Sequence, residues 1–233
     1  MRSTIPLLII ALLIVTDLSG QSRSRKRRVK FKKGFELQAM AGVNLSQIDG
    51  DLFQGFDQTG LNAGVQVNAL LAPSIGVNVG MMFSQKGSRT QHLSPNPSPR
   101  YPKDRNLRLN YVEIPVTLKL ALSRKQTRSF FEVGGTVSRL FSNNIEEREL
   151  RFVEGTSLVE ISPEFESTDI NALAGFGYDI GEHISLIFRY QLALTSFYEN
   201  PDLEPGRQFI VDRTPDIEFM RNYNISFLIG YRI

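Results

Sequence analysis

Apolar and polar residues alternate along most of the chain after Lys33, with the two-residue period of a β-strand that has one apolar and one polar face. The clearest run extends from Phe35 to Leu45, where polar residues such as Glu36 and Asn44 separate the apolar ones. No window after Lys33 has sustained helical spacing. Seven further segments share the period: they lie near 61–71, 75–83, 107–122, 131–141, 170–178, 184–194 and 223–233. The pattern therefore predicts eight strands.

The segment near 107–122 changes phase along its length. Leu107, Leu109 and Tyr111 share one phase, whereas the apolar residues from Ile114 onward share the other. A β-bulge near Tyr111 explains the change and also tolerates Pro115, which has no N–H to donate. We therefore predict a bulge at this position, with both apolar runs facing outward.

The connections between the predicted strands alternate between long and short. The long ones are 47–58, 87–106, 143–166 and 197–220, and the short ones are 72–74, 123–128 and 181–183. Outer-membrane barrels have an even number of strands, short periplasmic turns and longer extracellular loops, whereas a soluble β-sandwich has no reason to sort its loops by length. We therefore predict an all-β fold over 34–233: an eight-stranded antiparallel transmembrane up-and-down β-barrel with short periplasmic turns and long extracellular loops.

In such a barrel the polar phase faces inward. Eight strands enclose a space that side chains can fill, so charges inside must pair with one another. Five acids and five bases form the predicted interior polar network, which favours a plugged interior over a conducting pore. They are Glu36, Lys86, Arg108, Glu113, Lys119, Glu132, Asp169, Asp179, Arg189 and Arg232.

The N-terminal segment has the features of an export signal. Arg2 precedes eleven mostly apolar residues, Ile5–Val15, a length typical of a signal-peptide core and too short for a transmembrane helix. A small residue, Gly20, precedes a suitable cleavage point. We expect residues 1–20 to be a signal peptide; a buried or anchored N-terminal helix is the alternative.

Charge is distributed unevenly along the chain. The net charge is +3, but residues 1–33 hold nine basic residues and one acid, so the rest of the chain carries a net charge of −5. The basicity therefore belongs to a short segment, and the sequence does not predict a nucleic-acid-binding protein. There is no Cys, which excludes disulfides and thiolate metal sites, and only two His. We expect no cofactor and no metal.

A series of short motifs resembles a known family. They are Gly42-Val43-Asn44, Gly60-Leu61-Asn62, Gln85-Lys86-Gly87, Tyr111-Val112-Glu113-Ile114-Pro115 and the Gly230-Tyr231-Arg232 ending. Together they resemble the PorT-family outer-membrane β-barrel domain over essentially all of 34–233. The resemblance implies an outer-membrane location in a diderm (Gram-negative) bacterium. The founding member is a component of the type IX secretion system, and the family implies no catalytic residues.

Two regions are candidate interaction surfaces. Residues 21–33 form a predicted basic periplasmic tail, which either docks on acidic lipid, peptidoglycan or a partner, or stays solvated. Loop 143–166 is acidic but contains apolar residues that suggest a hairpin extending above the membrane, and loops on a rigid scaffold often carry binding. The candidate contacts are Arg23, Arg25, Lys26, Arg27, Arg28, Phe152, Val153 and Leu158.

Other chemistry is weakly indicated. His92 lies in a Pro-rich loop and His183 in a tight turn, and nothing in the sequence places either beside a nucleophile. Asp49-Gly50-Asp51 does not match a complete calcium loop. Gly175 and Gly177 lie in a strand with no helix after them, so they are inward-facing glycines rather than a dinucleotide fingerprint.

The sequence thus predicts a non-enzymatic outer-membrane barrel with a structural or protein-interaction role. The alternatives are an accessory component of a secretion or assembly machine, a lipid A-modifying enzyme and a narrow porin. Expected partners are outer-membrane lipid and lipopolysaccharide, and another envelope protein or a secretion-system subunit.

Overall fold

The computed structural model describes residues 34–51, 55–89, 103–122, 128–149, 158–200 and 217–233. The basic segment, His92, Phe152 and Val153 lie outside the described residues. The elements in chain order are β1 (Phe35–Asp49), β2 (Gln58–Ala72), β3 (Ile75–Arg89), β4 (Lys103–Ala121), β5 (Ser129–Glu149), α2 (Leu158–Ile161), the 3₁₀ turn η2 (Ser162–Glu164), β6 (Thr168–Ile180), β7 (Ile184–Ala193), β8 (Tyr198–Glu199) and β9 (Phe219–Arg232). Within the described residues no helix is long and apolar enough to cross a membrane.

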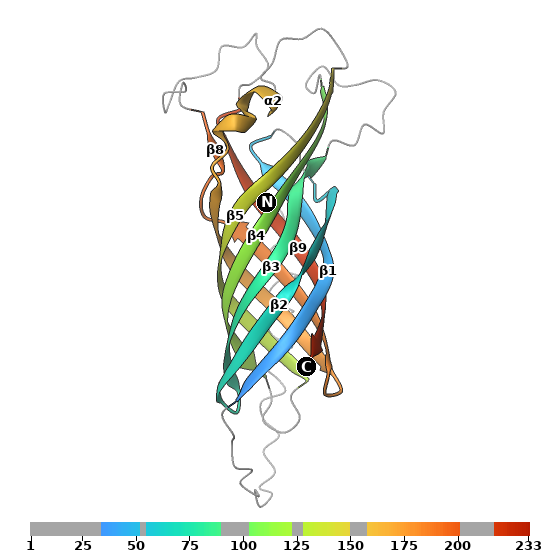
Figure 1. Ribbon diagram of the computed structural model, residues 1–233, viewed down its shortest axis with the longest axis vertical. Coiled ribbons are helices and arrows are strands. Elements are labelled where there is room, and N and C mark those ends of the chain that lie inside the picture. Colours follow the sequence, from blue (N-terminus) through green and yellow to red (C-terminus); the bar gives the residue numbers. More distant parts are fainter. Residues whose placement is uncertain (1–33, 52–54, 90–102, 123–127, 150–157, 201–216) are drawn as a thin grey trace, which may run out of the picture. The chain divides into compact units, whose positions relative to one another are not determined.

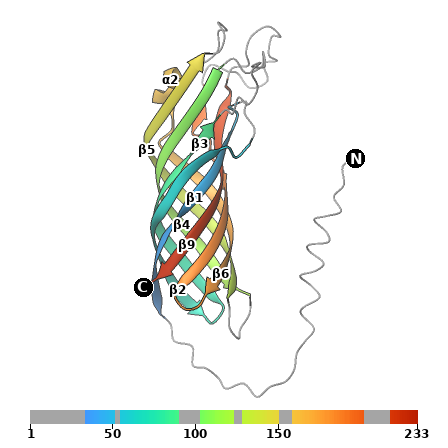
Figure 2. The same cartoon turned by 90° about the vertical axis from the view of Figure 1, so that its right-hand side faces the viewer.

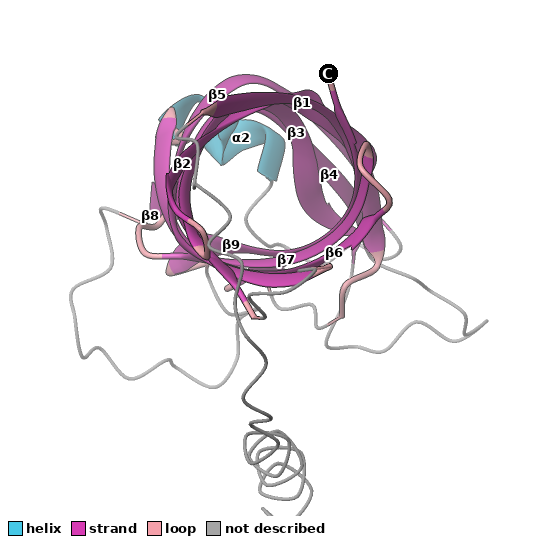
Figure 3. Cartoon of the chain, turned by 90° about the horizontal axis from the view of Figure 1, so that it is seen from below, coloured by secondary structure: helices cyan, strands magenta, loops and turns pink. Residues whose placement is uncertain are grey.

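Eight of the strands form a closed antiparallel barrel, which confirms the predicted fold class. Each strand from β1 to β7 pairs with the next, β7 pairs with β9, and β9 returns to β1. Twelve residue pairs join β1 to β9, from Gln38 opposite Arg232 to Asp49 opposite Arg221. Figures 1 and 2 show the tilted strands and the seam where β1 and β9 meet, and the view from below in Figure 3 shows the closed ring. The two-residue β8 pairs only with β9 and lies outside the ring of eight.

The outer face of the barrel is apolar, as the two-residue period requires. On β3, Ile75, Val79 and Met81 are between 40% and 59% exposed, while the residues between them are buried or partly buried. Val67, Val79 and Val116 lie side by side across β2, β3 and β4. Such a belt is stable against lipid and would be unfavourable in water, so the outer face is suited to a bilayer.

The predicted bulge is present, but its extra residue lies on β5 and not on β4. The β4–β5 register does shift beside Tyr111, but the extra residue is Phe141 of β5: Tyr111 lies opposite Leu140 and Asn110 opposite Ser142. The inward phase of β4 continues without a break, so Leu107 faces inward with Tyr111. The barrel interior is polar in its middle and apolar at its outer end. The apolar positions of β4 therefore lie on the inner face at the outer end and on the outer face further along the strand, while the strand itself stays regular.

Pro115 affects a different pair of strands. The β3–β4 pairing runs up to Val79 opposite Val116 and resumes with Met82 opposite Glu113, and it is interrupted around Pro115. The missing N–H of proline accounts for this gap. A Cβ on Gly80 would lie 3.2 Å from Cγ of Pro115, so a glycine at this position leaves room for the proline side chain.

Candidate functional site

The middle of the barrel interior is held by a bidentate ion pair between Arg189 of β7 and Glu132 of β5. The Nε–Oε1 distance is 2.5 Å and the Nη2–Oε2 distance is 3.1 Å, and both side chains are at most 3% exposed. Arg189 also donates to Oε1 of Gln66 at 2.6 Å, while Asn78 and Thr117 donate to Glu132. These contacts join five strands, and a bidentate pair with additional hydrogen bonds is the geometry that compensates for burying two charges.

Gly175 of β6 makes this ion pair possible. It lies between the partners in the sheet, opposite Glu132 on one side and Arg189 on the other. A Cβ at this position would lie 2.8 Å from Cγ and Oε1 of Glu132. The glycine therefore lets the two side chains meet across an intervening strand, and it faces inward as predicted.

A second ion pair lies nearer the outer end. Nζ of Lys86 is 2.6 Å from Oε1 of Glu113, and the Lys86 ammonium lies 5.5 Å from the ring centroid of Tyr111. Ser138 and Gln191 donate to the two oxygens of Glu113 at 3.3 Å. All of these side chains are buried, so this cluster blocks the interior as the first one does.

Asn44 of β1 is the centre of an uncharged cluster beside these pairs. Its amide nitrogen donates to Ser84 at 2.9 Å, and its carbonyl oxygen accepts from Asn62 at 3.0 Å and from Ser226 at 2.7 Å. Asn44, Asn62 and Lys86 belong to the motifs that resemble the PorT family, as do Tyr111 and Glu113. The structure brings these motif residues together in the interior, so what they share is a role in filling the barrel.

Asp169 of β6 links the polar interior to the apolar outer end. Its two oxygens accept hydrogen bonds from Asn222 at 3.3 Å and from Thr195 at 3.0 Å. Asn222 also donates to the Tyr111 hydroxyl at 3.0 Å. The Tyr111 ring belongs to the apolar cluster above it, so this residue connects the two regions.

The outer end of the barrel is closed by an apolar cap. Leu158 of α2 is 1% exposed, and the ring of Phe165 lies 5.3 Å from that of Phe197. Glu147 of β5 accepts a hydrogen bond from the Leu158 N–H at 2.9 Å and pairs with Arg105 of β4 at 3.0 Å, which fastens the short helix to the barrel. We define the apolar cap as Ile48, Leu107, Leu109, Tyr111, Leu158, Phe197, Tyr198, Ile217 and Met220.

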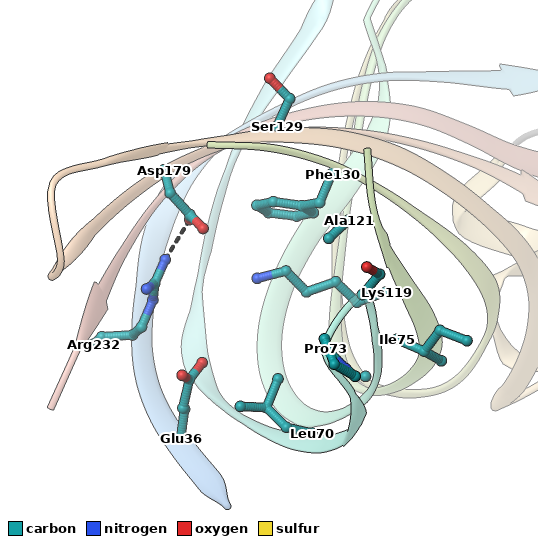
Figure 4. A pocket seen from close by; sticks show the side chains of 12 residues that line it. Glu36, Leu70, Pro73, Ile75, Lys119, Ala121, Ser129, Phe130, Asp179 and Arg232 are labelled. Atoms are coloured by element: carbon teal, nitrogen blue, oxygen red, sulfur yellow. Dashed lines mark ion pairs between the residues drawn. The ribbon is translucent and has the colours of Figure 1, made fainter. Parts of the chain in front are cut away.

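The short-turn end contains a pocket of about 190 Å³ (Figure 4). Arg232 forms an ion pair with Asp179, and Ser185 donates to Asp179 at 2.6 Å. Nζ of Lys119 lies 3.9 Å from the ring centroid of Phe130. Figure 4 shows these charged side chains converging on the pocket, and we call the site the periplasmic pocket.

Two predicted site residues lie elsewhere than expected. Arg108 is exposed on the outer face, because Leu107 and Leu109 on either side of it point inward. Leu158, a candidate contact residue, is 1% exposed and lies within the apolar cap. Residues 150–157 of the predicted hairpin lie outside the described residues, and before them β5 continues to Glu149 by pairing with β4.

The other predicted interior residues lie inside the barrel. Lys86, Glu113, Glu132, Asp169, Asp179 and Arg189 are buried, and Glu36, Lys119 and Arg232 are partly exposed at the short-turn end. The buried amides around Asn44 lie on the polar phase that the alternation places inside, whereas the inward apolar residues of the cap run against that pattern. Asn44, Asn62, Asn78 and Asn224 alternate with apolar residues in the sequence, and this alternation is the signal for their inward position.

The structure describes one of the two histidines of the chain. His183 is exposed in a turn, where its ring stacks on Tyr231 with a centroid distance of 5.8 Å. Among the described residues no group of three or more His, Cys, Asp or Glu side chains is placed to hold a metal ion.

The fold and the filled interior define a transmembrane barrel of the outer-membrane type. The family model for the outer membrane protein beta-barrel domain matches residues 20–199, and the chain belongs to this family. It is an outer-membrane β-barrel protein. No curated protein matches the chain.

Several solved barrels are similar to the chain. The attachment invasion locus protein Ail of Yersinia pestis is 10% identical with a TM-score of 0.43, covering 85% of this chain and 98% of Ail. Neisserial surface protein A is 11% identical with a TM-score of 0.43, covering 87% of this chain and 100% of that one. OprG from Pseudomonas aeruginosa is 10% identical with a TM-score of 0.41, covering 87% of this chain and 97% of OprG.

Proposed function

We propose that the protein is a closed, non-enzymatic outer-membrane barrel with a structural or protein-interaction role, which it performs through its outer end. The observation that carries the proposal is the filled interior. The Arg189–Glu132 and Lys86–Glu113 clusters cross the barrel, and the apolar cap lies above them. An interior held by ion pairs and sealed by apolar residues leaves the outer surface and the two ends available for function.

The outer end supplies an ordered surface for a partner. β4 and β5 extend to the top of the molecule, and α2 lies beside them (Figure 1). Glu164, Glu166 and Glu199 are exposed there and line a depression of about 390 Å³ with Arg221. The proposed partner is another envelope protein with a basic surface, and outer-membrane lipid and lipopolysaccharide would surround the apolar belt.

This proposal is tested by charge reversal at the outer end. We expect the tagged protein, purified from its own membranes in mild detergent, to retain a stoichiometric partner. The double substitution Glu164→Lys with Glu166→Lys reverses two exposed charges, so recovery of the partner should fall at least about tenfold, the effect of losing roughly 1.4 kcal/mol of binding free energy. Glu182→Lys, in an exposed turn at the opposite end, is the matched control and should leave recovery unchanged. A monomer without a partner would contradict the interaction role.

An accessory role in a secretion machine, type IX in the resembled family, is the second candidate. It is supported by the PorT-like motifs, of which Asn44, Lys86 and Glu113 are examples. Because these residues fill the interior, they support a barrel architecture in common with the PorT family more strongly than a binding partner in common with it. Identification of the copurifying protein as a secretion subunit, with impaired export in a deletion strain, would favour this role over a free-standing barrel.

A further inference from the structure

The periplasmic pocket is lined by one ion pair and by two further charged side chains. Arg232 of β9 is paired with Asp179 of β6, and Ser185 of β7 contacts both partners, at 2.6 Å to Asp179 and 3.2 Å to Arg232. These three side chains fix one wall of the pocket.

Lys119 of β4 and Glu36 of β1 are differently placed. Among the described inward-facing cations, Lys86, Arg105, Arg189 and Arg232 each have a carboxylate within ion-pair distance. Lys119 instead has its ammonium against the face of the Phe130 ring, at 3.9 Å from the centroid. Glu36 lines the same pocket from the neighbouring part of the wall (Figure 4).

Most of the remaining pocket lining is apolar, with Ser74 and Ser129 as its other polar side chains, and an apolar cluster lies between the pocket and the middle of the barrel. Phe130 is 3% exposed and packs in a cluster that separates the pocket from the Arg189 network. The other members of the cluster are Met40, Met82, Ile187 and Leu228. Leu70, Pro73 and Ile75 line the side of the pocket, so a ligand that enters from the periplasmic end meets an apolar floor and side wall.

The charged side chains that line the pocket indicate which class of ligand it binds. Two cations and two carboxylates line the pocket, so it is neutral overall, and a bound ion of one sign would leave a charge uncompensated. A zwitterion places a carboxylate near Lys119 and an ammonium near Glu36. Because a cavity of roughly 150 Å³ holds benzene, a pocket of about 190 Å³ has room for a slightly larger molecule. We propose that the periplasmic pocket binds a small zwitterion, an α-amino acid with an apolar side chain.

Calorimetric titration of the full-length protein in detergent with leucine tests this assignment. Isocaproate has the same skeleton without the amine, and isoamylamine has it without the carboxylate. We expect saturable binding of leucine and affinity at least about tenfold weaker for either analogue, because each loses one charge-assisted hydrogen bond. Equal binding of isocaproate or isoamylamine, or no saturable heat with leucine up to its solubility limit, would overturn the proposal.

Two variants locate the binding site. Lys119→Met and Glu36→Gln each remove one charge at similar volume, and each should weaken leucine binding at least about tenfold. Arg108→Gln removes an exposed charge on the outer face and should bind leucine as the unmodified protein does. Circular dichroism of each variant verifies that the barrel is folded. If folded Lys119→Met and Glu36→Gln proteins bind leucine with unchanged affinity, the pocket is not the site.

Discussion

At the scale of single residues, the barrel depends on burying charges only with their partners. Arg189 and Glu132 are at most 3% exposed and make a bidentate contact, and Gln66, Asn78 and Thr117 occupy further positions around them. The desolvation cost of such a pair is offset only while both charges are present. The arrangement therefore predicts a strong asymmetry between single and double substitutions.

Arg189→Met should lower the free energy of unfolding by about 3–5 kcal/mol, because it leaves the Glu132 carboxylate buried without its cation. Guanidinium unfolding in detergent micelles measures the change. The double variant Arg189→Met with Glu132→Leu removes both charges and should regain most of the lost stability. A double variant as unstable as the single one would mean that packing around Arg189, rather than its charge, matters.

At the scale of elements, the short helix α2 works as part of a lid. It has only four residues and no helix of this length is stable alone, so tertiary contacts must hold it. Those contacts are the packing of Leu158 in the apolar cap and the hydrogen bond from its N–H to Glu147. The ring of Phe165, which follows η2, packs against two further rings. Its centroid lies 5.3 Å from that of Phe197 and 6.2 Å from that of Tyr198.

Phe197→Ala should therefore destabilise the cap by about 3–5 kcal/mol, the usual cost of an aromatic cavity in a core. Hydrogen exchange followed by mass spectrometry should show faster exchange in α2 and β8, while the strands around Arg189 keep their protection. Val159→Ala is the control, because Val159 is 53% exposed on the same helix and its truncation leaves no buried cavity. Equal acceleration of hydrogen exchange in α2 by both variants would contradict the role of α2 as part of a lid.

At the scale of the whole molecule, a closed ring of eight strands combines an apolar exterior with a filled interior. Two interior ion-pair clusters and the apolar cap lie along the path that an ion would follow. An eight-stranded ring is just wide enough for side chains to fill, so there is little room for a water column beside them.

The full-length protein should accordingly show no stepwise conductance in planar lipid bilayers. A porin inserted under the same conditions is the positive control. The Phe197→Ala variant should also be silent, because the Arg189 and Lys86 clusters lie below the cap and remain in place. Reproducible current steps from the unmodified protein would contradict the closed interior and favour the narrow-porin alternative.

The sequence by itself determined the number of strands, their approximate positions and the face that each residue type occupies. The reason is that a two-residue period is a local property: every second residue of a strand points the same way, and lipid requires one face to be apolar. It also indicated which charges enter the interior, except where the interior itself is apolar. There the pattern predicts the wrong face: it places Arg108 inside and Leu107 and Leu109 against lipid, whereas the structure has them the other way round.

The tertiary structure alone decided which groups meet. Arg189 contacts Gln66 although 123 positions separate them along the chain, and it reaches Glu132 across a whole strand at Gly175. Such pairings depend on strand register and on the closure of β9 against β1, which no local pattern encodes. The burial of Leu158 has the same cause: its neighbours in the cap come from distant strands, and only the folded barrel brings them to one end.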